Sequence, residues 1–298
     1  MRTGSPLRVA MMIALGRSLL LASLVRAEAP PAAAPNQVFK QATPIATLKL
    51  GVVSSTLRVS ADGQRIAYMA TLEGGGEAVF VNDEQSPKYG GIVNDSLSFS
   101  PDSQRVGWGA LRDGNKVVVV DGKEYSALNG SAEGMPVWSP DSQRFAYFAA
   151  TDDGKLAAVV DGQPGESWDS VIRESFVFSP DSSRFAFVAK DGDVGRVIVD
   201  GKPGPRYRNV AGFTFSPNGK HFAYVAMFEQ SMSIIVDGVE MATGRSFIKD
   251  TLRFDGPRTL HVVRLDGNQL VREQINLIGL TGPSEATSPS SAPTKPEP

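Results

Sequence analysis

The chain has 298 residues, of which 41% are hydrophobic, and its 32 acidic and 30 basic side chains give a formal net charge of −2. This charge argues against a general affinity for nucleic acid, which requires a basic surface that displaces counterions from phosphates. The chain contains no cysteine. Disulfide bonds, thiolate metal ligands, cysteine nucleophiles and a lipid anchor on cysteine are therefore excluded.

Residues 1–27 have the pattern of an export signal. Arg2 and Arg8 give a positive start, residues 9–25 are mostly apolar, and small residues follow at a candidate cleavage site. Arg17 interrupts the apolar stretch, so an uncleaved anchor is the alternative. Removal of residues 1–27 would leave 26 basic and 32 acidic residues, a net charge of −6. We therefore expect a periplasmic or secreted protein without a membrane span in the mature chain.

Composition divides the rest of the chain into three parts. Residues 28–44 are rich in Ala and Pro, and residues 281–298 are rich in Pro, Ser and Thr. Neither segment can bury much apolar surface, so we expect a flexible segment and a disordered tail. Residues 45–280 are then the folded domain.

This domain contains a repeat that begins with Ser-Pro-Asp or a close variant. The aligned serines are separated by steps of 40, 39, 40 and 37 residues, and they are Ser60, Ser100, Ser139, Ser179 and Ser216. A period of this length is typical of repeat architectures, in which each unit buries its apolar face against its neighbours.

One repeat predicts four antiparallel strands. Residues 97–100 form a short strand, residues 106–111 a buried one, residues 116–120 a β-branched one, and residues 124–128 a more polar one. Asp121-Gly122 favours a two-residue hairpin between the third and fourth strands, because its central positions need positive φ. The unit is an up-and-down, four-stranded sheet.

The other copies preserve these features. The hairpin dipeptide lies 21 or 22 residues after each serine, at Asn82-Asp83, Asp161-Gly162, Asp200-Gly201 and Asp237-Gly238. The second strand carries an aromatic residue after a small one, at Tyr68, Trp108, Tyr147, Phe187 and Tyr224. Radially repeated four-stranded units of about 40 residues predict an all-β fold, a β-propeller.

The sequence predicts six blades. Five complete units are followed by a sixth that supplies only three strands, up to Asn276. Residues 51–58 match residues 91–98 and 170–177, which we interpret as the ends of fourth strands that lead into the next blade, so residues 46–53 should be a fourth strand at the N-terminus. We therefore expect this N-terminal strand to pair near residues 270–275, completing the last blade and removing the open edges.

The segments FSPDSQR, VVVDGK and FAYxA resemble the WD40-like repeats of bacterial β-propellers of the TolB type and of prolyl oligopeptidase-like enzymes. The resemblance covers roughly residues 46–280 and implies the propeller fold. Those families carry an additional α/β domain or a hydrolase domain. The chain is most similar to exported, stand-alone propellers of unassigned function.

The repeated acids have two interpretations. Asp102, Asp141 and Asp181 could form a functional ring, or each could accept the N–H groups of its own turn. Because these acids recur in every blade, turn chemistry is favoured. The basic residues that follow, such as Arg105 and Arg144, are expected to pack and pair beside the turns.

Signals for catalysis or metal binding are weak. The chain has two histidines and no G-x-S-x-G motif. Residues 100–108 depart from the Asp-box of sialidases, and the acids at 152–154 and 191–193 lack the ligand pattern of calcium loops. We expect no catalytic residue, no metal and no cofactor.

Binding is expected on the variable loops between second and third strands and between blades. The candidate binding residues are Arg112, Asp113, Asp152, Asp153, Lys190, Asp193, Arg206, Tyr207, Arg208 and Glu229. We expect a monomer that binds a protein, peptide or glycan of the cell envelope without catalysis. One alternative is a hydrolase or lyase acting on a sugar polymer, with carboxylates in the central funnel. A purely structural envelope component is the other.

Overall fold

The computed structural model describes residues 42–126, 132–228, 231–244, 246–248 and 250–280. The predictions for residues 1–41, for the tail at 281–298 and for Glu229 lie outside these residues. All described strands belong to the unit Pro44–Pro298. The all-β prediction is confirmed there, since a single 3-10 turn, η1 (Ser54–Thr56), is the one described helix.

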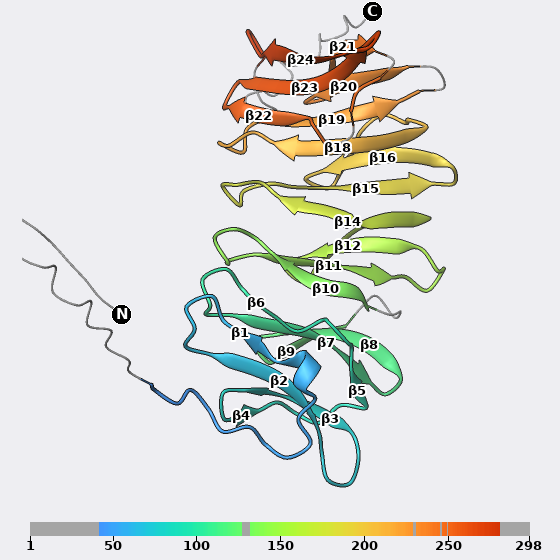
Figure 1. Cartoon of the computed structure of the whole chain (residues 1–298). Coiled ribbons are helices and arrows are strands. Elements are labelled where there is room, and N and C mark those ends of the chain that lie inside the picture. The colour runs from blue at the N-terminus through green and yellow to red at the C-terminus, as the bar shows by residue number, and fades with distance from the viewer. Residues whose placement is uncertain (1–41, 127–131, 229–230, 245, 249, 281–298) are drawn as a thin grey trace, which may run out of the picture. The chain divides into compact units, whose positions relative to one another are not determined.

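The described strands form six antiparallel sheets, numbered here in chain order (Figure 1). Sheet 1 contains β1 (Arg58–Val59), β2 (Ile66–Thr71), β3 (Glu77–Val81) and β4 (Glu84–Gln85), and sheet 2 contains β5 (Gly91–Ile92), β6 (Ser98–Phe99), β7 (Val106–Arg112), β8 (Asn115–Val120) and β9 (Lys123–Ser126). Sheet 3 contains β10 (Ala132–Trp138), β11 (Phe145–Ala150), β12 (Leu156–Val160) and β13 (Gln163–Trp168). Sheet 4 contains β14 (Ser170–Phe178), β15 (Phe185–Asp191), β16 (Val194–Val199) and β17 (Lys202–Pro203). Sheet 5 contains β18 (Asn209–Phe215), β19 (Phe222–Met227), β20 (Met232–Val236) and β21 (Val239–Gly244), and sheet 6 contains β22 (Arg253–Gly256), β23 (Thr259–Asp266) and β24 (Gln269–Asn276).

The hairpins between third and fourth strands have the predicted geometry. At Asp121-Gly122 φ is 51° and 77°, and at Asp161-Gly162 it is 54° and 80°. Two successive residues with positive φ match the right-handed twist of the flanking strands. The up-and-down order of each complete sheet follows from these hairpins and is confirmed.

Successive sheets pack face to face in chain order. Each pair of neighbours shares a buried cluster, which we call a seam. The second strands supply the predicted large residue to the first four seams, where Trp108, Tyr147, Phe187 and Tyr224 are each at most 3% exposed. Tyr68 is also buried, in a cluster with Ala46 and Val52 on the face of sheet 1 that is turned away from sheet 2. The alternation of these rings with fully buried alanines lets the sheets nest closely.

The first strands are longer than the sequence predicts, because a bulge divides them. In sheet 2 the Ser96 hydroxyl lies in this bulge, donating to the Val93 carbonyl (2.6 Å) and accepting from the Gly109 N–H (2.8 Å). Equivalent hydroxyl bonds occur at Thr56, Ser175 and Thr251. The hydroxyl satisfies backbone groups that the extra residue would leave without partners.

The predicted closure of the last blade by residues 46–53 is wrong, because it treats these bulged first strands as ends of fourth strands. Residues 46–53 do not supply the fourth strand of sheet 6. Instead, Val52 pairs with Ala70 on β2, and the Val53 N–H donates to the Met69 carbonyl (2.9 Å). The segments interpreted as ends of fourth strands are the starts of bulged first strands. Among the described residues, β23 is therefore the one strand paired with β24.

The Ser-Pro-Asp turns join neighbouring sheets as well as closing their own hairpins. In sheet 3, Asp141 accepts from the Ser139 hydroxyl (2.6 Å), and the Asp141 N–H donates to the Ser182 hydroxyl of sheet 4 (3.0 Å). Arg144 pairs with Asp161 (2.9 Å) and donates to the Ser182 carbonyl (3.3 Å). The turn interpretation of the repeated acids is confirmed at these positions.

These turns make stability sensitive to acid. Hydrogen bonds from Ser60, Ser100 and Ser139 hydroxyls and from backbone N–H groups lower the pKa of Asp62, Asp102 and Asp141 below the ordinary 3.8. A pKa lower in the folded than in the unfolded state stabilises the fold above pH 3.8, and this contribution is lost as pH falls through the folded pKa.

We therefore expect the wild type to lose more stability between about pH 5 and about pH 2.5 than a triple variant with Asn at these three positions. Asn218 accepts from the Ser216 hydroxyl (2.7 Å) in sheet 5, so the amide fits the turn. Urea unfolding at both pH values measures the difference. Equal losses in the two proteins would contradict the assignment.

Candidate functional site

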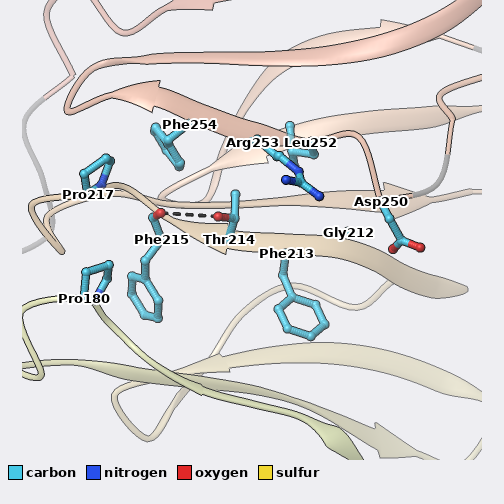
Figure 2. A pocket seen from close by; sticks show the side chains of 10 residues that line it. All are labelled: Pro180, Gly212, Phe213, Thr214, Phe215, Pro217, Asp250, Leu252, Arg253 and Phe254. Atoms are coloured by element: carbon cyan, nitrogen blue, oxygen red, sulfur yellow. Dashed lines mark hydrogen bonds between the residues drawn. The ribbon is translucent and has the colours of Figure 1, made fainter. Parts of the chain in front are cut away.

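A pocket of about 660 Å³ lies between the first strands of sheets 5 and 6. Figure 2 shows Arg253 and Phe254 on β22 on one side of β18, and the rings of Phe213 and Phe215 on the other side, where they pack against sheet 4. The pocket runs from Asp250, in the connection before β22, to the prolines of the Ser-Pro turns. We call the end with these connections and the turns between second and third strands the loop end. The end with the Ser-Pro turns and Asp-Gly hairpins is the hairpin end.

A break in the repeat contributes to this pocket. Gly212 stands four residues before Ser216, where Thr56, Ser96 and Ser175 precede their serines by the same number. It has a φ of 54°, and a Cβ there would meet no atom closer than 3.8 Å. Glycine adopts this φ readily and leaves the space of the missing hydroxymethyl group beside β22.

The charged groups of the pocket are Arg253 and Asp250, and both residues are exposed. Neither has an ion-pair partner within the described residues. By contrast, the corresponding pocket between the first strands of sheets 1 and 2 contains Arg58, which pairs with Asp95 at 3.2 Å. Arg58 occupies the repeat position of Arg253. An exposed guanidinium without an ion-pair partner presents a planar fork that suits a carboxylate or phosphate.

One of the predicted binding residues, Arg206, lies in a cluster of charged residues on sheets 3 and 4. Arg206 pairs with Asp191 (2.8 Å), and its side chain is 61% exposed. Asp169 accepts from the Gly192 N–H (2.7 Å) and lies 3.8 Å from Lys155. Turns from both sheets thus form one cluster of alternating charges at the loop end.

Other predicted residues serve the turns themselves or face solvent beside them. Asp153 accepts from the Thr151 hydroxyl, which lowers the pKa of the Asp153 carboxyl. Asp113 has a φ of 52° in its turn. The exposed side chains near the cluster are those of Asp152, Asp193 and Arg208, and Lys190 is half-buried at the end of β15.

Arg112 lies apart from this cluster. It pairs with Glu124, donates to the Lys88 carbonyl (3.3 Å) and covers the Tyr89 ring at 4.5 Å from its centroid. The hydrogen bond to Arg112 lowers the pKa of Glu124. Arg112 therefore fastens sheet 2 to the last segment of sheet 1.

Tyr207 is a core residue, which corrects its prediction as a surface contact. It is 7% exposed, and its hydroxyl lies 3.1 Å from the Tyr224 hydroxyl. Burial, with the hydrogen bond between the two hydroxyls, raises the pKa of Tyr224 far above its ordinary value. The flanking arginines suggested an exposed edge, but Tyr207 forms a backbone bridge with Gly195 that points its ring into the seam.

The sequence-based predictions did not include Arg253 and Asp250. The available signal was Gly212, a glycine where most copies carry a hydroxyl residue. Within the part of the chain that the structure describes, no three His, Asp or Glu side chains gather as a metal-ion site. No helix of that part has the length and apolar character needed to cross a membrane.

Comparisons with known proteins give matches to solved structures. No protein-family model and no curated protein matches the chain. TolB from Acinetobacter baumannii is 16% identical, with a TM-score of 0.32, over 72% of this chain and 61% of that one. The β-propeller domain of the Trilobed protease from Pyrococcus furiosus is 17% identical, with a TM-score of 0.36, over 77% of this chain and 82% of that one. The description of the fold therefore rests on the repeated antiparallel sheets of this chain itself, which match the expected blades of a β-propeller.

Proposed function

We propose that the protein is an exported, non-catalytic six-bladed β-propeller that binds a protein, peptide or glycan partner of the cell envelope. The binding surface comprises the loop-end cluster of sheets 3 and 4 and the pocket between β18 and β22. The pattern of residues 1–27 supports export. The rigid seams support a role in which variable loops are held in fixed positions for a partner.

The observation that carries this proposal is the side chain of Arg253. It is exposed, lines a pocket with Phe213 and Phe254, and has no ion pair among the described residues. Arginine and aromatic side chains are enriched among the residues that dominate binding energy. An unpaired guanidinium on a strand is a fixed recognition point for an acidic group of a partner.

Most other charged groups nearby are already engaged, which favours binding over acid–base catalysis. Asp191 pairs with Arg206, Asp169 accepts from a backbone N–H, and the acids of the Ser-Pro-Asp turns accept hydrogen bonds in those turns. General acid catalysis by a carboxyl group needs a raised pKa. Asp153, the loop-end acid whose pKa is shifted, is shifted downward.

Site-directed crosslinking tests the proposal, because a cysteine-free chain accepts one unique thiol. The Asp250→Cys and Asp193→Cys variants carry a thiol-reactive photocrosslinker at the loop end and keep the Arg253 side chain. Gln104→Cys, exposed in a Ser-Pro-Asp turn, is the matched control at the hairpin end. Each labelled protein is added to intact envelopes of the cells that produce it.

We expect one defined adduct from the loop-end positions and none from Gln104→Cys. An Arg253→Glu change in the Asp193→Cys protein should remove that adduct. Equal yields from all positions, or turnover of a polysaccharide by the wild type, would overturn the proposal. Turnover would favour the alternative of a carbohydrate-active hydrolase or lyase.

A further inference from the structure

A third pocket, of about 780 Å³, lies at the hairpin end of the seam between sheets 4 and 5. Its apolar walls are Val197 and Val199 on β16 and Phe222 and Tyr224 on β19. The third strand of one sheet faces the second strand of the next in the other seams as well. The opening at this seam therefore has a local cause.

The seam between sheets 2 and 3 shows what fills the corresponding place. Tyr125 on β9 packs edge-to-face on Phe145, with 5.0 Å between the ring centroids. It adjoins the buried cluster that contains Val118 and Val120. These two valines precede their hairpin aspartate by the same numbers of residues as Val197 and Val199 do. A tyrosine ring is thus the natural filling of this site in the chain itself.

Gly204 takes the place of Tyr125 in sheet 4. Each follows its hairpin aspartate by four residues. The Gly204 N–H donates to the Val197 carbonyl (2.8 Å), and Tyr125 pairs with Val118, the counterpart of Val197. The register is therefore the same in both sheets, and the difference is the missing ring.

The missing ring leaves apolar surface accessible. Val199 is partly exposed, whereas its counterpart Val120 is 1% exposed. The neighbouring prolines at 203 and 205 lack N–H donors, and β17 ends at Pro203. The fourth strand therefore does not continue over the pocket as β13 does in sheet 3.

The charges at the rim favour an acidic ligand. Asp200 pairs with Arg184 (2.8 Å), and Asp237 pairs with His221 (2.6 Å). Lys202 is exposed at the rim and has no ion pair among the described residues. Of the charged residues that line the pocket, four are basic and three are acidic: Arg144, Arg184, Lys202 and Lys220 against Asp181, Asp200 and Asp237. This positive balance, with Lys202 exposed at the rim, favours negative groups beside the apolar opening.

We propose that this pocket binds the tyrosine side chain of a partner peptide in which acidic residues flank the ring. The ring would cover Val199 and lie against the walls as Tyr125 lies against Phe145. A Cβ added at Gly204 would lie 3.9 Å from the Tyr224 hydroxyl, so a hydrogen-bonding group is within reach of a phenol. The pocket lies at the hairpin end, so its test is independent of the function proposed for the loop end.

The test uses a fluorescein-labelled peptide, Gly-Asp-Glu-Tyr-Glu-Asp-Gly, and the full chain. Fluorescence anisotropy should show binding at least about tenfold tighter than that of the same peptide with alanine for tyrosine, because the ring supplies the apolar contact. A peptide with lysines in place of the acids should bind weakly. Equal affinities for the tyrosine and alanine peptides would overturn the proposal.

Matched variants locate the site. Gly204→Tyr should fill the pocket and weaken peptide binding at least about tenfold, whereas Gly165→Tyr, at the same repeat position of sheet 3, should leave it unchanged. Tyr125→Gly should create a second site and double the stoichiometry. Lys202→Glu, a surface change, should weaken binding even if Gly204→Tyr fails to fold. Binding that none of these variants changes would place the ligand elsewhere and contradict the proposal.

Discussion

Replacing Phe176 with alanine is expected to lower the free energy of unfolding by about 3–5 kcal/mol. Phe176 is 6% exposed in the seam between sheets 3 and 4, and its ring centroid lies 6.0 Å from those of both Phe148 and Phe187. Alanine removes the apolar contacts of the ring and leaves a cavity that strands on both sides hold open. Urea unfolding followed by circular dichroism measures the change.

The matched control is Leu270→Ala on β24. Leu270 is 69% exposed, so the same kind of truncation should change the free energy of unfolding by no more than about 0.5 kcal/mol. Because seams couple only neighbouring sheets, loss of the seam at Phe176 should also broaden the unfolding transition. A Phe176→Ala variant as stable as Leu270→Ala would show that this seam does not contribute to the folded state.

The second large effect is expected for Asp161→Ala, at about 2–4 kcal/mol. Asp161 accepts from the N–H of the buried Phe145 (3.0 Å) and pairs with Arg144 (2.9 Å). Its φ of 54° lies in the left-handed region, which alanine adopts at a cost. The substitution therefore leaves a buried donor without a partner and strains the hairpin at the same time.

The Asp161→Asn variant separates the loss of the hydrogen bond and the strain in the hairpin from the loss of the carboxylate charge. Asn82 stands at the same repeat position in sheet 1, has a φ of 53° and accepts from the Ile66 N–H (2.9 Å). The asparagine variant should therefore lose less than about 1 kcal/mol, mainly from the exposed pair with Arg144. Thermal unfolding of the two variants gives the comparison. Similar losses for Ala and Asn would mean that the ion pair, rather than the hairpin geometry, is the important contact.

Local patterns predicted the blade well because each relevant signal is short in range. The Asp-Gly dipeptides require positive φ at both positions, and the structure has it at Asp121-Gly122 and Asp161-Gly162. The aromatic residues of the second strands are buried as expected. The acids after Ser-Pro accept hydrogen bonds from within their own turns. Each of these interpretations is confirmed in several copies of the repeat.

Non-local pairing was less predictable. The sequence around Ser96 looks like a connection between blades, because polar residues interrupt the apolar pattern. In the structure the Ser96 hydroxyl replaces a ladder hydrogen bond, so the first strand continues on both sides of a bulge. The prediction treats the two halves of this first strand as separate elements, and it therefore assigns the half before the bulge to the preceding blade instead of to its own sheet. The predicted closure at residues 46–53 failed for the same reason.

The sequence by itself determined the period, the order of strands within a blade and the chemistry of the turns, because these depend on residues close together in the chain. Only the tertiary structure decided that Tyr207 is buried, that Arg253 stays unpaired in a pocket between sheets 5 and 6, and that Gly204 leaves a seam open. These properties arise where one sheet meets the next. A single copy of the repeat does not contain that information, because the neighbouring sheet supplies half of each site.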